Sequence, residues 1–425
     1  MKKTTGRILQ GEHGQTLLMF VLFMVVLFVF VGLGVDLGFA YITKARLSKA
    51  VDSAALTGAR SVGQGTISAS AIAKTAFSAN YGTSGRDVSP PVPSVVFSYD
   101  AANNLLLDVS ATSAINTFFI RVLPTVLPGA PAGLWRTLTV GSVAQALRAK
   151  IVLSLVLDHS GSMKSNGGAA ALPGAVANFI DLFYENYDRA SMSSFSQYAT
   201  ADVPMRPDFK APITTAAALP FPGSYTCTEC GLTNGLAQNA PVVVAAGEKV
   251  IKAIVLFTDG MANTFTYKFN CGFRNIDYND GLYNVTNGNS SSSGCTIPPN
   301  INSIDPKTGV ITSGTVSTSG GSQCADLHNE AQNRAVRIAH LAREQGILVY
   351  AIGMGSPGSP GECGFPVLNP DFLKDVANTP DAPDYDSSTA NQVNYAGDYA
   401  IAADSSQLDQ VFQTIGEKIL LRLTR

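Results

Sequence analysis

The hydrophobic pattern of this 425-residue chain begins with a long run that has no polar face. The twenty residues from Thr16 to Val35 carry no charge. At about 1.5 Å rise per residue, a helix of this length crosses a hydrocarbon core of roughly 30 Å. A cleaved signal peptide has an apolar region of only about 7–15 residues, so the pattern favours an uncleaved transmembrane helix. From Ala40 to Arg60 the apolar residues recur near helical spacing, which predicts an amphipathic continuation of this helix.

The middle region, residues 61–148, has shorter and more varied patterns. The Ala/Ser-rich stretch 67–81 predicts a helix, and three prolines at 90, 91 and 93 end it. The apolar triplets 95–97 and 105–107 flank Asp100-Ala-Ala-Asn103 and predict a β-hairpin. A small α+β module is therefore expected here.

The C-terminal half contains apolar runs of strand length that predict a parallel sheet. Residues 151–157 and 251–257 are nearly continuous in apolar side chains, as strands buried on both faces require. Further strands are expected at 189–195, 198–205 and 347–352, and helices at 172–187, from about 231, at 324–345 and at 408–423. This order of elements predicts an α/β, doubly wound Rossmann-like domain with an antiparallel edge pair.

Acidic and hydroxyl side chains follow the two central strands. The first strand ends in Asp158-His-Ser160-Gly-Ser162, and the second in Thr258-Asp259-Gly260. The carboxyl ends of parallel strands meet at one edge of the sheet, where open α/β folds bind their ligands. Thr226 lies between them in sequence, just before the helix expected from about residue 231.

These residues resemble the metal-ion-dependent adhesion site of von Willebrand factor type A (VWA) domains. Strand, motif and spacing all match, with 68 residues from Asp158 to Thr226 and 33 from Thr226 to Asp259. Gly231 and Leu232 sit where the family has a small residue followed by leucine. The resemblance implies a VWA domain over residues 149–424 and a metal site formed by Asp158, Ser160, Ser162, Thr226 and Asp259. Thr228 is the alternative to Thr226.

The chemistry of this ligand set predicts one divalent cation, with Mg²⁺ preferred and Mn²⁺ or Ca²⁺ as alternatives. Hard cations bind oxygen, and Mg²⁺ takes about six ligands. The family implies that the two acids act through bound water, which leaves the cation under-neutralised and ready to bind an acidic side chain of a protein partner. The expected partner-binding rim consists of His159, Met163, Thr228, Gly260, Met261 and Asn263.

The N-terminal segment resembles TadE/TadG-like Flp pilus-assembly proteins. The resemblance rests on Gly14, the apolar span, Gly34-Val-Asp36, the stretch Arg46 to Asp52, and Ala54-Ala-Leu56. It implies a cytoplasmic tail at residues 1–13, a transmembrane helix at 14–36, and a TadE/TadG-like helix with a small α+β module at 37–148.

Six cysteines lie in the C-terminal half, and their even number suits disulfides in an oxidising compartment. The sequence does not fix how Cys227, Cys230, Cys271, Cys295, Cys324 and Cys363 pair; it favours a local 227–230 bridge, with 271–295 and 324–363 as the remaining pairs. Zinc binding by Cys227-Thr-Glu-Cys230 is the alternative, but no second Cys-x-x-Cys or His pair follows.

The orientation of the membrane helix does not follow from charge, because basic residues lie on both sides of the apolar span. The cysteines and the large C-terminal mass favour an extracytoplasmic C-terminal domain. The chain is then a single-pass protein of the inner membrane.

About sixty residues, 261–323, separate Asp259 from the next expected helix and are rich in Asn, Ser, Gly and Thr. They are expected to form a structureless insertion that is closed by a Cys271–Cys295 disulfide and either shapes partner specificity or is a tolerated surface loop.

The stretch Gly353-x-Gly355-x-x-Gly358 matches a dinucleotide-binding pattern, but Pro357 and Pro360 interrupt the helix that this pattern needs.

The composition narrows the function further. The net charge is −2, without a basic stripe, which argues against nucleic acid as a partner. His159-Ser-Gly-Ser162 is not a Gly-x-Ser-x-Gly nucleophile motif, and no general base is evident beyond the site acids, so the chain is not expected to be an enzyme. The sequence predicts a membrane-anchored, metal-dependent protein-binding module that contacts lipid through its helix and acts with other pilus-assembly components or in cell-surface attachment. The alternative is a surface adhesin for a host or matrix ligand, unrelated to pili.

Overall fold

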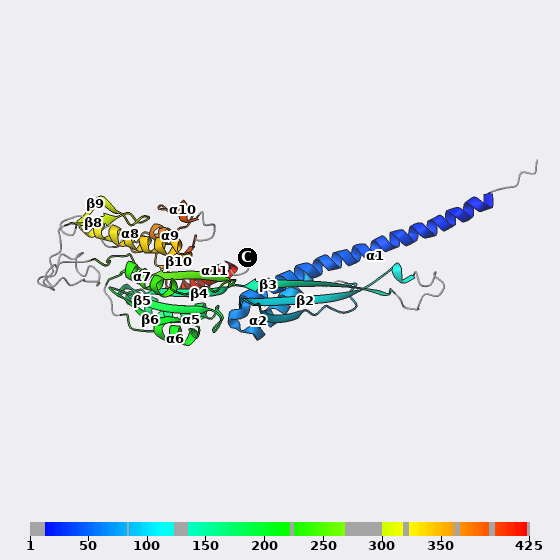
Figure 1. The fold of residues 1–425 in the computed structure, drawn as a ribbon, viewed down its shortest axis with the longest axis horizontal. Helices are drawn as coiled ribbons and strands as arrows, with labels where there is room; N and C mark the ends of the chain where they lie inside the picture. Colours follow the sequence, from blue (N-terminus) through cyan, green and yellow to red (C-terminus); the bar gives the residue numbers. More distant parts are fainter. Residues whose placement is uncertain are drawn as a thin grey trace, which may run out of the picture. The chain divides into compact units, whose positions relative to one another are not determined.

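The computed structural model describes residues 13–82, 85–122, 135–221, 225–267, 300–317, 323–359, 361, 366–390 and 396–422. The chain forms two compact units (Figure 1). The first comprises residues up to 58 together with 70–98 and 107–146, and the second comprises 59–69, 99–106 and everything from 147 onward.

The first unit contains a long helix and a small sheet. Helix α1 runs without a break from His13 to Arg60, and α2 runs from Thr66 to Tyr81. Three strands are hydrogen-bonded in the order β1-β2-β3, with bounds Ser94–Tyr99, Leu105–Asn116 and Thr137–Arg148. The helix and hairpin expected here are confirmed.

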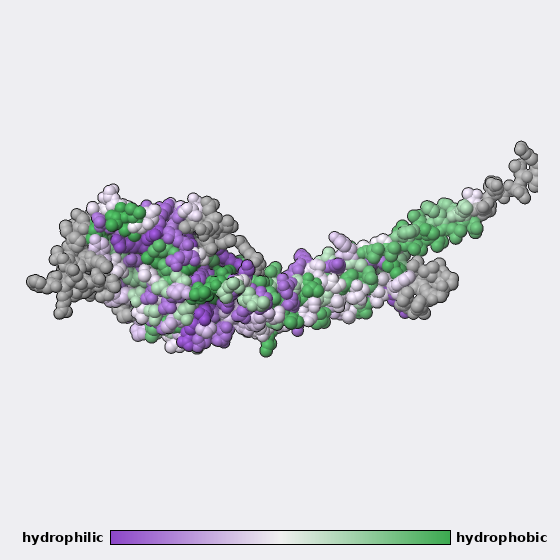
Figure 2. Space-filling model, in the orientation of Figure 1, coloured by the Kyte–Doolittle hydropathy of each residue, from purple (hydrophilic) through white to green (hydrophobic). Residues whose placement is uncertain are grey.

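Helix α1 changes character along its length. Its N-terminal half exposes large apolar side chains, and Figure 2 shows the resulting continuous hydrophobic surface. Its C-terminal half buries Leu47, Val51 and Ala54, as the amphipathic pattern predicts. Among the described residues, this is the one helix that is long and apolar enough to cross a membrane.

The second unit is built on a six-stranded sheet with the order β11-β10-β7-β4-β5-β6. All neighbours are parallel except β5 and β6, which form the antiparallel edge pair expected from the sequence. The strand bounds are β4 Lys150–Asp158, β5 Arg189–Phe195, β6 Ala199–Arg206, β7 Val250–Thr258, β10 Ile347–Met354 and β11 Tyr399–Ala402. The expectation of a doubly wound α/β domain is confirmed.

Helices cover both faces of this sheet. One face packs Leu153, Leu155 and Leu157 against α5 and α11, whose bounds are Gly168–Ile180 and Leu408–Leu421. The other face packs Val156 and Ile254 against three helices, α7 Thr228–Asn239, α8 Gln323–Glu344 and α9 Pro370–Ala377. The remaining short helices are α4 Ser162–Ser165, α6 Lys210–Ala217 and α10 Ser387–Ala390. Helix α5 begins four residues before the expected range of 172–187 and ends at Ile180, seven residues before the end of that range.

Part of the insertion is folded, which corrects the expectation of a structureless loop. Strands β8 (Asn300–Ile304) and β9 (Ile311–Ser317) form an antiparallel hairpin. Ile301 and Val316 are buried in the same core cluster as Leu327 of α8. The expected Cys271–Cys295 pair lies outside the described residues, as does the side chain of Cys324 and the whole of Cys363.

Two short segments group with the second unit although the sequence placed them in the preceding module. Both described attachments belong to the segment 99–106. The Tyr187 hydroxyl accepts a 2.9 Å hydrogen bond from the Leu105 backbone N–H. The Asn104 side chain accepts from the Lys249 N–H at 2.7 Å and donates to the Gly247 carbonyl at 3.1 Å. The hairpin turn is therefore part of the C-terminal unit.

Candidate metal centre

The two acids of the expected site lie together at the carboxyl edge of the sheet. Strands β4 and β7 are parallel neighbours in which Leu157 pairs with Phe257, so Asp158 and Asp259 follow at the same edge. Both side chains are almost fully buried, with 0% and 1% of their surfaces exposed. Two carboxylates at one buried corner repel each other and lose hydration, which is unfavourable without a compensating charge.

Asp158 is held by two neutral donors. One carboxylate oxygen accepts the Ser160 backbone N–H at 2.8 Å, and the other accepts the Thr258 hydroxyl at 2.7 Å. Burial, followed by the nearby charge of Asp259, raises the pKa of Asp158 to about 7. The structure thus fixes the orientation of this carboxylate but does not neutralise it.

The Asp259 carboxylate accepts hydrogen bonds from the hydroxyls of both serines. Its Oδ1 accepts from Ser162 Oγ at 2.8 Å and from Ser160 Oγ at 3.5 Å, and the two serine oxygens are 2.9 Å apart. Its Oδ2 accepts from Asn166 Nδ2 at 2.5 Å. Burial raises the pKa of Asp259, and the neutral donors only partly oppose this rise.

Thr226 lies at the same corner. A Cβ placed on Gly260 would be 3.9 Å from Thr226 Oγ1 and 3.8 Å from Ser162 Oγ, so both hydroxyls adjoin the turn that follows Asp259. The Thr226 backbone donates to Asn263 Oδ1 at 2.8 Å, and its carbonyl accepts from the Asn263 N–H at 3.1 Å. This pair of hydrogen bonds holds Thr226 against the segment that begins at Asp259.

Helix α7 brings Thr226 to the sheet through close packing. Gly231 and Gly235 lie one turn apart on the face of α7 that meets β4. A Cβ on Gly231 would be 2.6 Å from the Phe195 ring and 2.8 Å from Val156. A Cβ on Gly235 would be 2.5 Å from Val156. Only glycine allows this approach, and the approach fixes the position of the residues before the helix.

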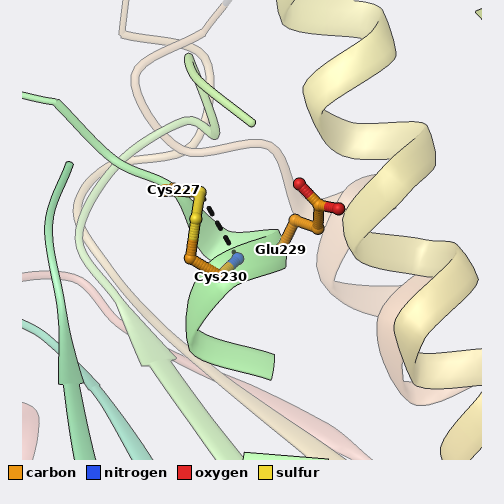
Figure 3. Close-up of side chains that lie close together, drawn as sticks. All are labelled: Cys227, Glu229 and Cys230. Carbon is orange, nitrogen blue, oxygen red and sulfur yellow. Dashed lines mark hydrogen bonds between the residues drawn. A yellow bond between two sulfur atoms is a disulfide. The ribbon is translucent and has the colours of Figure 1, made fainter. Parts of the chain in front are cut away.

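A disulfide joins Cys227 and Cys230 at the start of α7 (Figure 3). Cys227 is the residue after Thr226, and its N–H donates to the Ser196 carbonyl at 2.7 Å. Both sulfurs are consumed in the bridge, so they are not thiolate ligands, which excludes the zinc interpretation for the bridged form. Figure 3 also shows Glu229 directed toward α8, and its carboxylate accepts the Thr266 N–H at 2.7 Å.

The burial of the expected rim residues requires a correction. His159, Met163 and Thr228 are only 2%, 0% and 0% exposed, so they offer no side-chain surface to a partner. His159 stacks on Phe221 with ring centroids 4.2 Å apart, and Met163 belongs to the core. Gly260 is also buried, and Met261 is 8% exposed. Asn263 remains half-buried beside the site.

The open side of the site is formed by other residues. Ser162 and Asn166 are exposed, whereas Asp158, Ser160 and Asp259 lie beneath them. Asn166 and the orienting role of Thr258 were not predicted. An exposed Asn in a short turn has no periodic pattern, while Thr258 stands beside Asp259 in the motif and could have been noticed as a strand-end hydroxyl.

The donor set suits a hard divalent cation. Two carboxylates and three hydroxyls converge, and every hydrogen-bond donor to the two acids within the described residues is neutral. A divalent cation would offset the repulsion between Asp158 and Asp259. Asp158, Ser160, Ser162, Thr226 and Asp259 are the residues that would hold it, with coordination directly or through water.

The glycines at the C-terminal end of β10 and directly after it have a structural role. A Cβ on Gly353 would lie 2.6 Å from Leu373 and 3.0 Å from Leu368, so this glycine is needed for packing. Gly355 has a φ of 141°, a conformation that favours glycine, and its N–H donates to the Ala402 carbonyl at 2.8 Å. The amide is therefore used within the fold rather than directed at a phosphate.

Comparison with solved structures gives weak similarities over much of the chain. The pilus adhesin SpaC from Lactobacillus rhamnosus GG is 16% identical with a TM-score of 0.42, covering 78% of this chain but 35% of the adhesin. The chain thus spans about a third of that protein's length. The vWF domain of the type V pili tip protein Mfa5 from Porphyromonas gingivalis is 18% identical with a TM-score of 0.41, covering 66% of this chain and 98% of that domain.

A third solved structure is proximal thread matrix protein 1 from the mussel byssus, described with a zinc-occupied MIDAS motif. It is 16% identical with a TM-score of 0.35, covering 64% of this chain and 46% of that protein. No curated protein matches this chain. Residues 14–61, which form most of α1, match the family model described as "Putative Flp pilus-assembly TadE/G-like".

Proposed function

We propose that this protein is a membrane-anchored binding module that captures an acidic side chain of a protein partner through a divalent cation at the Asp158/Asp259 corner. The supporting observation is the convergence of two buried acids and three hydroxyls, where the acids accept hydrogen bonds only from neutral donors in the described part of the chain. Mg²⁺ is the expected ion, with Mn²⁺ or Ca²⁺ as alternatives. The bound ion would supply a positive charge that an incoming carboxylate completes, so the proposed role is binding rather than catalysis.

The accessible side of the site supports this role. Ser162 and Asn166 are exposed and Asn263 is half-buried, so a partner side chain would approach between them. The buried acids beneath are out of the partner's reach. We therefore place Ser162, Asn166 and Asn263 at the partner-binding surface.

The anchor and its family point to pilus assembly. The N-terminal 14–61 segment matches a pilus-assembly family, and α1 carries a span that could cross a membrane. The Cys227–Cys230 disulfide favours an oxidising compartment for the C-terminal unit. The N-terminus is then cytoplasmic, α1 anchors the chain in the inner membrane, and the metal site is extracytoplasmic. The proposed partners are other pilus-assembly components or a surface-attachment ligand. Protease added to spheroplasts should cleave the C-terminal unit, and full protection would contradict this orientation.

The metal-dependent step is tested in two stages with the full chain in detergent. Calorimetry with Mn²⁺ and Mg²⁺ should show one site in the wild type, and at least a tenfold loss of affinity in Ser162→Ala. Ser165→Ala is the matched control, because Ser165 is exposed on the same short helix and donates to the Ser162 carbonyl rather than to an acid. Absence of any metal uptake by the wild type would contradict the proposal.

The second stage measures partner capture from a cell-envelope extract. Proteins retained in Mg²⁺ should be lost in EDTA and from Ser162→Ala, but kept by Ser165→Ala. Capture that persists in EDTA would remove the ion from the binding step. The identity of the retained protein separates pilus assembly from attachment to a host or matrix ligand.

A further inference from the structure

The N-terminal unit contains an apolar groove beside the membrane-crossing part of α1. Its volume is about 530 Å³. One wall is formed by α1 residues Val25, Phe28, Val29 and Leu33. The opposite wall comes from the segments that follow β2 and precede β3, and it includes Phe119, Ile120 and Trp135. None of these side chains carries a charge, so the groove suits a hydrocarbon ligand.

The second wall is fixed to α1 by a buried carboxylate. Asp36 is 2% exposed and accepts three backbone N–H groups, from Phe118 at 2.9 Å and from Phe119 and Ile120 at 2.8 Å each. Three donors compensate the cost of burying this carboxylate next to an apolar span. One turn earlier on α1, a Cβ on Gly32 would lie 2.5 Å from Phe119 Cβ, so the glycine admits the Phe119 side chain. These contacts fix the second wall of the groove to α1.

The position of the groove along α1 indicates which layer of the membrane surrounds it. Val25 and Leu33 precede Asp36 by eleven and three residues. At 1.5 Å per residue they lie roughly 17 and 5 Å from Asp36 along the helix axis. If residues 16–35 span a hydrocarbon core of about 30 Å, the groove faces the leaflet nearer Asp36. Acyl chains fill that layer.

The surface around the groove has the composition of a membrane interface. Phe118, Phe119 and Trp135 are 46%, 50% and 44% exposed, a clustering of aromatics typical of the boundary between hydrocarbon and headgroups. Arg121 is exposed, with its guanidinium 5.5 Å from the Phe118 ring centroid, and Lys44 is exposed farther along α1. These cations would lie near lipid phosphates.

We propose that this groove binds an acyl chain of a membrane phospholipid and thereby seats the ends of β2 and β3 in the leaflet beside α1. The inference rests on the membrane anchor of the proposed function and is independent of the metal site. The module then has two apolar contacts with the bilayer, the helix and the lipid-filled groove.

Trp135 provides a direct probe, because it is the only tryptophan in the chain. The full chain is reconstituted into phosphatidylethanolamine/phosphatidylglycerol vesicles with or without bromine on the acyl chains. Bromination should reduce Trp135 fluorescence at least twofold, while aqueous acrylamide quenches it weakly. Fluorescence that is unaffected by bromine in a chain that floats with the vesicles overturns the groove inference alone. A chain that does not float with vesicles overturns the anchor as well.

A pair of substitutions separates lipid in the groove from lipid around the helix. Val29→Phe fills the groove, whereas Val26→Phe adds the same side chain at an exposed position of α1 that does not line it. Native mass spectrometry should show at least threefold less retained phospholipid for V29F and no change for V26F. Equal retention in both variants overturns the proposal. A photo-crosslinking residue at position 29 should couple to lipid, and coupling to a protein instead would show that another membrane helix occupies the groove.

Discussion

Thr258 and Asp158 end adjacent parallel strands, and the Thr258 hydroxyl donates a 2.7 Å hydrogen bond to the Asp158 carboxylate. The same hydroxyl accepts the Gly260 N–H at 3.3 Å, so one side chain orients an acid from β4 and the turn after β7. Both functions depend on the hydroxyl and not on the methyl group of threonine.

We therefore predict that Thr258→Val lowers affinity for Mn²⁺ and Mg²⁺ by about 10- to 100-fold, the usual cost of losing a partner that orients a metal ligand. Valine has nearly the same shape but cannot donate to Asp158. Thr258→Ser keeps the donor and should remain within about threefold of the wild type. Calorimetry measures both, and equal affinity in the valine variant would contradict the orienting role.

Metal binding should also stabilise the C-terminal unit. An ion that binds only the folded state adds about 2.7 kcal/mol when its free concentration is a hundred times the dissociation constant. The melting temperature should therefore rise by several degrees in Mg²⁺ and return on addition of excess EDTA. Ser162→Ala should show a smaller rise at the same Mg²⁺ concentration. Identical melting curves in Mg²⁺ and EDTA would be inconsistent with a site built from this corner.

Strands β4 and β7 are buried on both faces, and the sequence predicted their positions closely. Each strand extends only one residue beyond its predicted range at each end. The prediction was close because an unbroken apolar run of this length is typical of a strand that is buried on both faces. Their strand-end acids followed directly from the parallel arrangement. The parallel pairing expected for β4 and β7 therefore predicted that Asp158 and Asp259 lie at the same edge of the sheet.

The features that the sequence did not reveal depend on contacts distant along the chain. The strands of the β8–β9 hairpin are mostly polar, and Ile301 and Val316 are the buried ones among the side chains that the structure describes there, so the hairpin depends on packing against α8. The three N–H groups that bind Asp36 lie 82 to 84 residues away. Local propensity carries no information about such pairings.

The glycines of α7 give a prediction about stability and the site together. Gly231→Ala places a methyl group 2.6 Å from Phe195 and 2.8 Å from Val156, and overpacking of this kind costs about 1–3 kcal/mol. Relief of the clash moves the start of α7 away from β4, so metal affinity should fall as well. Thr233→Ala on the exposed face of the same helix is the control and should change neither quantity by much. Urea unfolding and calorimetry test the two effects, and an unaltered Gly231→Ala variant would show that the helix can shift freely.

A buried ion pair next to β4 should contribute strongly to the stability of the C-terminal unit. Arg148 and Asp188 are 0% and 1% exposed and form two hydrogen bonds, at 2.9 and 2.6 Å. Asp188 also accepts the Ile151 and Tyr184 N–H groups at 2.9 and 2.8 Å. Asp188→Asn leaves the guanidinium without its counter-charge, and we expect a loss of about 3–5 kcal/mol in the free energy of unfolding.

The exposed pair Arg206–Asp208 is the matched control for this substitution. Its side chains are 41% and 56% exposed, so solvent screens their attraction. Asp208→Asn should cost less than about 1 kcal/mol. Urea unfolding of the two variants compares the pairs directly, and similar losses in both would contradict the importance of burial.

His340 should make the C-terminal unit sensitive to acid. This α8 side chain is 1% exposed, and burial, followed by the positive charge of Arg343, lowers its pKa to about 4, although Asp386 opposes the shift. The unfolded chain binds a proton at this histidine below about pH 6.5, whereas the folded chain does so only near pH 4. The unfolded state thus holds more protons in this window, so the contribution of His340 to stability is complete above pH 6.5 and is lost as the pH falls toward 4.

Replacing His340 by leucine removes this titration and leaves an apolar side chain of comparable size in a buried position. The fall in the free energy of unfolding between pH 7.5 and 4.5 should then be smaller than in the wild type by about 2 kcal/mol. Urea unfolding at both pH values gives the difference, and the value at pH 7.5 reports the packing cost of the substitution separately. A variant that loses as much stability as the wild type over this interval would show that groups other than His340 account for the acid sensitivity.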